Sequence, residues 1–135
     1  MSATRVGATR PEGARAALEL ELVADPALLA AARLFAAAAA RAAGCDDDAV
    51  EDVRLAVSEA CARSMRGAAG HERVSVEARV GSDGVAFVVD GPIGSSEDPI
   101  DELDLVAALF PSSSSSESDG RTTVRFAAPA GRPPV

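Results

Sequence analysis

The 135-residue sequence has no lysine, tryptophan or tyrosine, and it has only one histidine, two cysteines and four phenylalanines. Without lysine, the chain cannot place a P-loop lysine on a phosphate or form a Schiff base with a substrate. Its one histidine, His71, excludes a metal site built from several histidines of one chain, and we expect it in an exposed loop. The shortage of aromatic rings and the net charge of -8 predict no nucleic-acid partner, because bases stack on rings and phosphates attract cations.

Cysteines and long apolar runs are also scarce. Cys45 and Cys61 are too few for a disulfide framework, so we expect free, buried thiols. The apolar run Leu34–Ala40 lies between two arginines and has seven residues, whereas a helix needs about 20 to span a bilayer. The N-terminal residues contain no apolar segment of the kind that a signal peptide has. We therefore expect a cytoplasmic protein with no membrane partner.

The remaining residues follow two hydrophobic periods, as in a domain with both strands and helices. Apolar and polar residues alternate, as in strands, at 17–23, 74–80 and 122–127. Apolar residues recur every three or four positions, as in helices, at 26–43, 46–66 and 100–110. The segment Val85–Val89 is continuously apolar, which predicts a central strand that is either covered on both faces or crowded by helices. The order of these segments predicts a two-layer α/β sandwich, with a mixed or antiparallel sheet of four to five strands and about three helices on one face.

Segments without either period set the expected boundaries. We expect residues 1–16 to be a flexible leader, residues 17–129 to form a single domain, and residues 130–135 to be a frayed tail. The serine run Ser112–Ser116 and the residues that follow it, 117–120, predict a flexible loop. Nothing in the sequence selects one of these serines as a phosphorylation site.

Glu59, in the second expected helix, is the first candidate for chemistry. A helical glutamate can act as a general base, but Arg63 follows four residues later. Glutamate and arginine at this spacing stabilise a helix by about 0.2–0.5 kcal/mol. The spacing therefore favours a structural ion pair between Glu59 and Arg63, and leaves the general base as the alternative.

The segment Asp90–Gly94 is the second candidate. Its aspartate follows the most apolar strand, and its glycines allow a ligand to approach the backbone. The alternative is a turn in which Asp90 accepts local hydrogen bonds. The segment alone does not decide between the two.

Three segments carry a resemblance that extends over roughly the whole expected domain, 17–129. They are the stretch Leu-Ala-Val-Ser-Glu-Ala at Leu55–Ala60, the strand Val85–Asp90 and the segment Gly120–Phe126. Together they resemble the Bergerat-fold (GHKL, histidine-kinase-like) ATPases, and specifically the small bacterial anti-sigma factor serine kinases. The resemblance implies the α/β sandwich of that family and binding of Mg-ATP between a helix layer and a lid. It also implies a protein that binds a sigma factor and phosphorylates a serine of a small antagonist protein.

Two departures from the family concern the metal and the lid. The resemblance places Glu59 at the general-base position, but Arg63 stands where the family has the asparagine that binds Mg²⁺. A guanidinium has no lone pair for a metal, so we expect no metal ligand here and an inactive Glu59. The family's glycine-rich lid should fall near Asp98–Leu105, which has no glycine and four acidic residues. Such a segment would repel a triphosphate.

The other nucleotide-binding positions are partly retained. Asp90 and Gly94 match the family's Asp-x-Gly-x-Gly motif, whose aspartate holds the adenine amino group, but Pro92 replaces the first glycine. Thr122 and Thr123 match the late threonine segment. We therefore expect Mg-ATP binding to be weak or absent, with Arg63 and Glu59 filling the former metal site.

Three hypotheses about function follow from the resemblance. The favoured one is an anti-sigma-factor-like protein that acts by binding a sigma factor or a small antagonist protein, with kinase activity lost. The second is an active ATP-dependent serine/threonine kinase in which Arg63 binds phosphate directly in place of Mg²⁺. The third is a non-catalytic protein that forms a heterodimer with such a kinase. The family also makes a homodimer an expectation.

Overall fold

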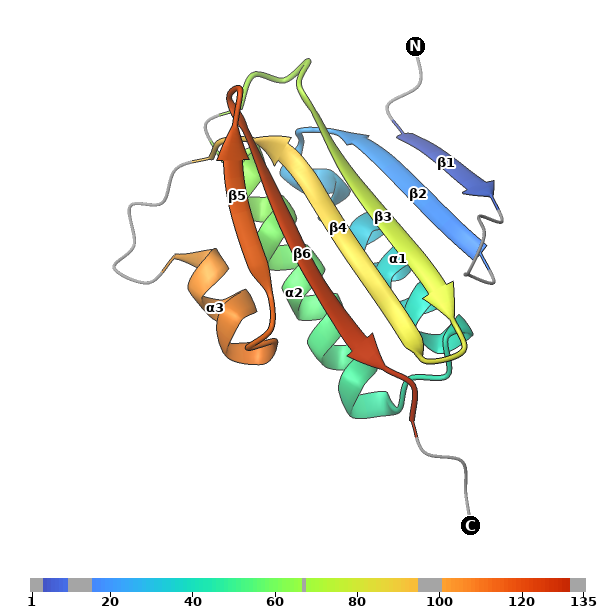
Figure 1. Cartoon of the computed structure of the whole chain (residues 1–135). Coiled ribbons are helices and arrows are strands. Elements are labelled where there is room, and N and C mark those ends of the chain that lie inside the picture. Colours follow the sequence, from blue (N-terminus) through green and yellow to red (C-terminus); the bar gives the residue numbers. More distant parts are fainter. Residues whose placement is uncertain (1–3, 10–15, 67, 95–100, 132–135) are drawn as a thin grey trace.

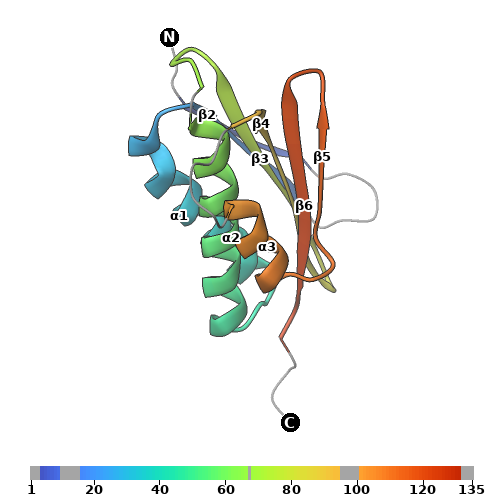
Figure 2. The same cartoon turned by 90° about the vertical axis from the view of Figure 1, so that its left-hand side faces the viewer.

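The computed structural model describes residues 4–9, 16–66, 68–94 and 101–131. They form six antiparallel strands in the order β1-β2-β3-β4-β6-β5 (Figure 1). The helices α1, α2 and α3 all lie on the same face of this sheet (Figure 2). The predicted two-layer α/β fold is therefore confirmed, and the sheet is antiparallel. It has six strands rather than four to five.

In chain order, the elements are β1 (Thr4–Thr9), β2 (Ala16–Val23), the 3-10 helix η1 (Pro26–Leu28), α1 (Leu29–Ala42), α2 (Asp47–Met65), β3 (Arg73–Gly81), β4 (Gly84–Pro92), α3 (Glu102–Leu109), β5 (Ser114–Ser118) and β6 (Arg121–Pro129).

The helices begin and end where short polar signals occur in the sequence. Asp25 caps η1 by accepting a hydrogen bond from the backbone N–H of Ala27, 2.9 Å away, and Pro26 follows it. Asp46 caps α2 in the same way through the N–H of Ala49, at 2.8 Å. Gly44 follows α1 with a φ of 79°, a left-handed conformation that glycine adopts without steric cost. These caps fix α1 and α2 as an antiparallel pair on the sheet.

The core lies between the helices and the inner face of the sheet. Strands β3 and β4 contribute every second residue to it, including the fully buried Val76, Phe87 and Val89. Phe126 of β6 stacks on Phe87 with ring centroids 5.3 Å apart. The buried residues of α1 are all alanines, namely Ala32, Ala36, Ala37, Ala39 and Ala40. Small side chains allow this helix to lie close to α2 and the sheet, which compensates for the low volume of an alanine-rich core.

Of the two alternatives predicted for β4, coverage on both faces is wrong. Ala86 is exposed and Val88 is partly exposed, whereas Val85, Phe87 and Val89 are buried. Because successive side chains of a strand point to opposite faces, β4 has one helix-covered face and one open face. The apolar residues on the open face are the small Ala86 and the partly exposed Val88, so this face does not need a second layer of helices.

Two segments that were expected to lack regular structure contain strands, β1 and β5. The strand β1 pairs with β2 in the segment expected to be part of a flexible leader; residues 1–3 and 10–15 of that leader lie outside the described part of the chain. The strand β5 pairs with β6 in the expected serine loop. Both are edge strands with little apolar patterning, so their neighbours, rather than their own hydrophobic period, determine their conformation. Asp119 and Gly120 join β5 to β6 with φ values of 53° and 77°, typical of a two-residue hairpin turn.

Candidate functional site

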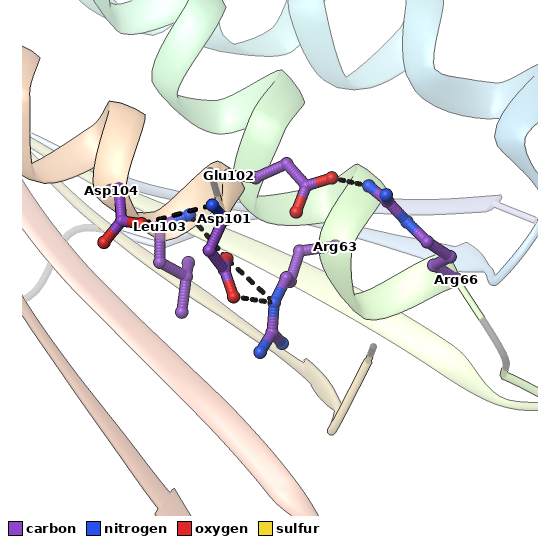
Figure 3. A network of polar contacts seen from close by, with 6 residues as sticks. All are labelled: Arg63, Arg66, Asp101, Glu102, Leu103 and Asp104. Atoms are coloured by element: carbon purple, nitrogen blue, oxygen red, sulfur yellow. Dashed lines mark hydrogen bonds and ion pairs between the residues drawn. The ribbon is translucent and has the colours of Figure 1, made fainter. Parts of the chain in front are cut away.

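Arg63 and Asp101 form the centre of the candidate site, where the C-terminal half of α2 meets the start of α3. The Nε of Arg63 donates a hydrogen bond to the Asp101 carboxylate at 2.9 Å (Figure 3). The Arg63 side chain is 12% exposed. One turn further along α2, Arg66 forms an ion pair with Glu102, which is 7% exposed. Two adjacent ion pairs therefore hold the N-terminus of α3 against α2.

The sequence-based prediction that Arg63 pairs with Glu59 is wrong. Among the described residues, Arg63 pairs with Asp101, which is 38 residues away in the sequence. Glu59 instead lies in a polar groove of about 360 Å³ on the outer side of α1 and α2, beside Arg33 and Ser58. In that groove the Nε of Arg33 donates to the Ser58 hydroxyl at 3.0 Å. An aspartate that caps the next helix is already held in place by the backbone of α3, so it is a fixed partner for Arg63.

Asp101 interacts with two backbone or side-chain groups of α3 and with two arginines at the C-terminal end of α2. It is the N-cap of α3, and it accepts a hydrogen bond from the N–H of Leu103 at 2.9 Å. The Asp104 carboxylate accepts one from the N–H of Asp101 at 3.1 Å, which completes a capping box. Partial burial raises the pKa of Asp101, but the Leu103 N–H and the charges of Arg63 and Arg66 outweigh this, so its pKa lies below its ordinary value. Asp101 is therefore an ionised partner for Arg63 at neutral pH.

Some polar atoms in this cluster have no partner among the described residues. The Nη1 of Arg63, the Oε2 of Glu102 and the Oγ1 of Thr122 are buried without a hydrogen bond there. Thr122 lies on the inner face of β6, opposite Gly91 of β4. Arg63, Thr122 and the end of β4 thus belong to the helix-covered side of the molecule.

Two glycines allow the end of β4 to approach α2 closely. A Cβ atom on Gly94 would overlap the backbone oxygen of Arg63. A Cβ on Gly91 would lie 2.8 Å from the Cβ of Ser64. No side chain fits at Gly94, so this predicted site residue is required for contact between the strand end and the helix.

Asp90 lies on the opposite, open face of the sheet. One of its carboxylate oxygens accepts a hydrogen bond from the Nε of Arg121 at 2.6 Å, and the other accepts one from the hydroxyl of Thr123 at 2.7 Å. Its neighbours Val89 and Gly91 are buried on the helix side. Asp90 and Thr123 are therefore brought together, but they are separated by the sheet from Arg63, Gly94 and Thr122.

The six predicted site residues thus occupy three places. Asp90 and Thr123 lie on the open face, Glu59 lies in the outer groove, and Arg63, Gly94 and Thr122 lie on the helix-covered side. Two residues of these sites were not predicted from the sequence: Asp101, the partner of Arg63, and Arg121, the partner of Asp90. The spacing Asp101-x-x-Asp104 is a capping signal that would have marked Asp101.

The comparison with protein families gives the identity of the domain. The family profile described as the histidine kinase-like ATPase domain matches residues 22–119. This chain belongs to that family. The match begins in β2 and extends to the turn before β6, so it contains α1, α2, α3 and the cluster around Arg63. A search of curated proteins gave no significant match.

The ATPase-domain family implies Mg-ATP, but the side chains around Arg63 do not fit a magnesium ion. The guanidinium has no lone pair, and the carboxylate closest to it is engaged by that guanidinium and by the cap of α3. Within the described residues, no group of three or more histidine, cysteine, aspartate or glutamate side chains is arranged to hold a metal.

The same domain has no described helix that is both long and apolar enough to cross a membrane. His71 is exposed, as expected from its loop position. Both cysteines are free; Cys61 is buried and Cys45 is half-buried.

Proposed function

We propose that this histidine kinase-like ATPase domain is an anti-sigma-factor-like regulator that binds a sigma factor or a small antagonist protein and does not transfer phosphate. The contact between Arg63 and Asp101 carries this proposal. At the position where relatives hold a metal ligand, this chain has a cation whose charge is neutralised by the next helix. A magnesium ion placed there would meet a positive charge and lose the asparagine oxygen that binds it in the family.

The charges near this position also oppose a triphosphate. Phosphoryl transfer depends on cations and N–H donors around the phosphates. The first turn of α3 instead has Glu102 and Asp104 after the Asp101 cap. The space expected for a lid is filled by a helix that is attached to α2 through two ion pairs. This supports a domain with a permanently closed cleft.

The adenine-binding position gives a third argument. A carboxylate that holds adenine between the helices and the sheet must lie on the helix side, but Asp90 lies on the open face. The residue of β4 that does lie on the helix side, two positions before Gly91, is Val89. A valine supplies no acceptor for an amino group. The helix side of β4 therefore offers no carboxylate for adenine at this position.

The direct test is a calorimetric titration of the full chain with ATP and with ADP, each with and without Mg²⁺. We expect no binding heat up to millimolar nucleotide in any of the four titrations. Micromolar, Mg²⁺-dependent binding would overturn the proposal.

Binding without Mg²⁺ would favour the second hypothesis, in which Arg63 contacts phosphate directly. Arg63→Ala would then abolish the heat. The matched control is Arg54→Ala, which removes an exposed arginine of the same helix that pairs with Glu51. Loss of binding in both variants would indicate general electrostatic attraction and would contradict a specific role of Arg63.

Partner binding needs its own measurement. Purified sigma factors and small antagonist proteins encoded by the same genome are titrated against the chain by biolayer interferometry, with and without Mg-ATP. A saturable interaction with one of them that does not change with nucleotide supports the proposal. Exclusive binding to a homologous kinase would instead support the heterodimer hypothesis.

A further inference from the structure

The serines of β5 form a feature that the proposed function does not use. All five residues of this strand, Ser114–Ser118, are exposed. β5 is the last strand of the sheet, so one side of its backbone has no strand partner among the described residues. An edge strand of this kind is accessible to another protein, which can pair with its free backbone groups.

The register with β6 places alternate serines beside arginines. Ser114 lies opposite Arg125, Ser116 opposite Thr123, and Ser118 opposite Arg121. Thr123 bonds to Asp90 on the open face, so Ser116 lies on that face as well. The diagonal neighbours of a residue in an antiparallel pair lie about 7–8 Å away, within reach of long side chains. Ser116 is therefore flanked by both arginines.

The charge at this position is available for an anion. Arg125 is exposed and makes no ion pair with another described residue. Arg121 is 43% exposed and shares its charge with Asp90. Two guanidinium groups on both sides of one hydroxyl are the arrangement that stabilises a phosphorylated side chain, because arginine binds phosphate oxygens in a bidentate manner.

We propose that Ser116 is a phosphorylation site, and that Arg121 and Arg125 hold its phosphate on the open face of the sheet. A separate serine kinase supplies the reaction with a nucleoside triphosphate. The Ser116 oxygen forms a bond to the γ-phosphorus, the bond to the β–γ bridging oxygen breaks, and the nucleoside diphosphate leaves. The hydroxyl proton passes to the base of that kinase. Acidic residues follow Ser116 at positions 117 and 119, so the kinase that fits is one that accepts an acidic sequence after the serine.

The preceding residue, Ser115, is a matched control for Ser116. Ser115 lies opposite Val124, on the other face of the strand, where neither arginine is its cross-strand partner. Phosphoserine is incorporated at Ser116 or at Ser115 of the full chain, and the phosphate is titrated by ³¹P nuclear magnetic resonance. We expect a lower second pKa for the phosphate at Ser116, because the arginines favour its dianion. Arg121→Gln combined with Arg125→Gln should remove the difference, whereas equal pKa values in the parent chains would overturn the arginine clamp.

Occupancy in the cell is tested by mass spectrometry of the protein isolated from its own host across growth phases and stress conditions. Phosphate on Ser116 supports the site. Phosphate confined to another serine, or absent under every condition, would overturn it. The result is separable from the proposed function, because nucleotide binding by this chain does not enter either measurement.

Discussion

Arg63 of α2 donates a hydrogen bond to the carboxylate of Asp101, the residue that caps α3, at 2.9 Å. The Asp101 carboxylate therefore stabilises both the first turn of α3 and the contact between α3 and α2. Arg63, at the position where the family resemblance predicted a magnesium ligand, is part of the packing between two helices.

Asp101→Ala removes both the cap of α3 and the partner of Arg63. Loss of an N-cap costs about 0.5–2 kcal/mol, and the half-buried guanidinium left without its partner adds to this, so we expect a loss of about 2 kcal/mol. The measurement is the free energy of unfolding from urea titration. Glu51→Ala, which breaks an exposed ion pair with Arg54, is the control and should change stability by less than about 0.5 kcal/mol. Equal effects of the two substitutions would contradict the role of Asp101.

The charge of Asp101 should make the stability depend on pH at its acidic end. The pKa of Asp101 in the folded chain lies below the ordinary value of 3.8. The unfolded chain therefore binds the proton first, so the stabilisation is complete above pH 3.8 and is lost as the pH falls through the folded pKa. Asn is also a good N-cap, so Asp101→Asn removes the charge while keeping the cap. The difference in unfolding free energy between the parent and Asp101→Asn should be constant near neutral pH and shrink below about pH 4; a difference that grows on acidification would refute the assignment.

Gly94→Ala should destabilise the chain strongly. Its new methyl group would overlap the backbone oxygen of Arg63, so the end of β4 must move away from α2. We expect a loss of about 3 kcal/mol or more, since overpacking of a side chain alone costs about 1–3 kcal/mol. Gly70→Ala is the control, because no described residue other than its two chain neighbours has an atom within 4 Å of the added carbon. Thermal unfolding of the two variants compares them, and a normal melting temperature for Gly94→Ala would contradict the close packing.

The two thiols should react at different rates. Burial raises the pKa of Cys61 to about 12, and burial together with Asp46 raises the pKa of Cys45. Cys61 is fully buried, so iodoacetamide reaches it only when the structure opens, whereas Cys45 is partly exposed. Mass spectrometry at pH 8 should show alkylation of Cys45 first and of Cys61 only after urea is added. Equal rates in the native chain would show that the core around Cys61 is open.

The sequence predicted the elements whose hydrophobic period is strong. The alternating residues of β2, β3 and β6 and the helical period of α1 and α2 were sufficient to locate the central sheet and the helix pair. β5 was missed because its residues are all polar and exposed, so only pairing with β6 makes it a strand. The dipeptide Asp119-Gly120 was the available signal, since it is typical of a two-residue hairpin turn.

The site was harder to predict than the fold. Glu59 and Arg63 were recognised as candidate site residues from their types and spacing. The partner of Arg63, however, is Asp101, which lies 38 residues away, and no local pattern connects Arg63 with Asp101. Asp90 was assigned to a ligand site because it follows the most apolar strand and matches the family motif. Alternation along β4 places Asp90 on the open face instead, opposite Thr123. Which face a polar residue occupies depends on the register of three strands, and that register is a long-range property.

The most direct measurement follows the Nε–H resonance of Arg63 by ¹H–¹⁵N nuclear magnetic resonance while Mg-ATP is added to millimolar concentration. Asp101→Asn identifies the resonance and gives its position when the ionised partner is removed. If Arg63 is a permanent part of the helix junction, its resonance stays at the hydrogen-bonded position throughout the titration. A saturable shift of that resonance toward the Asp101→Asn position would contradict the account, because it would show that Mg-ATP opens the junction.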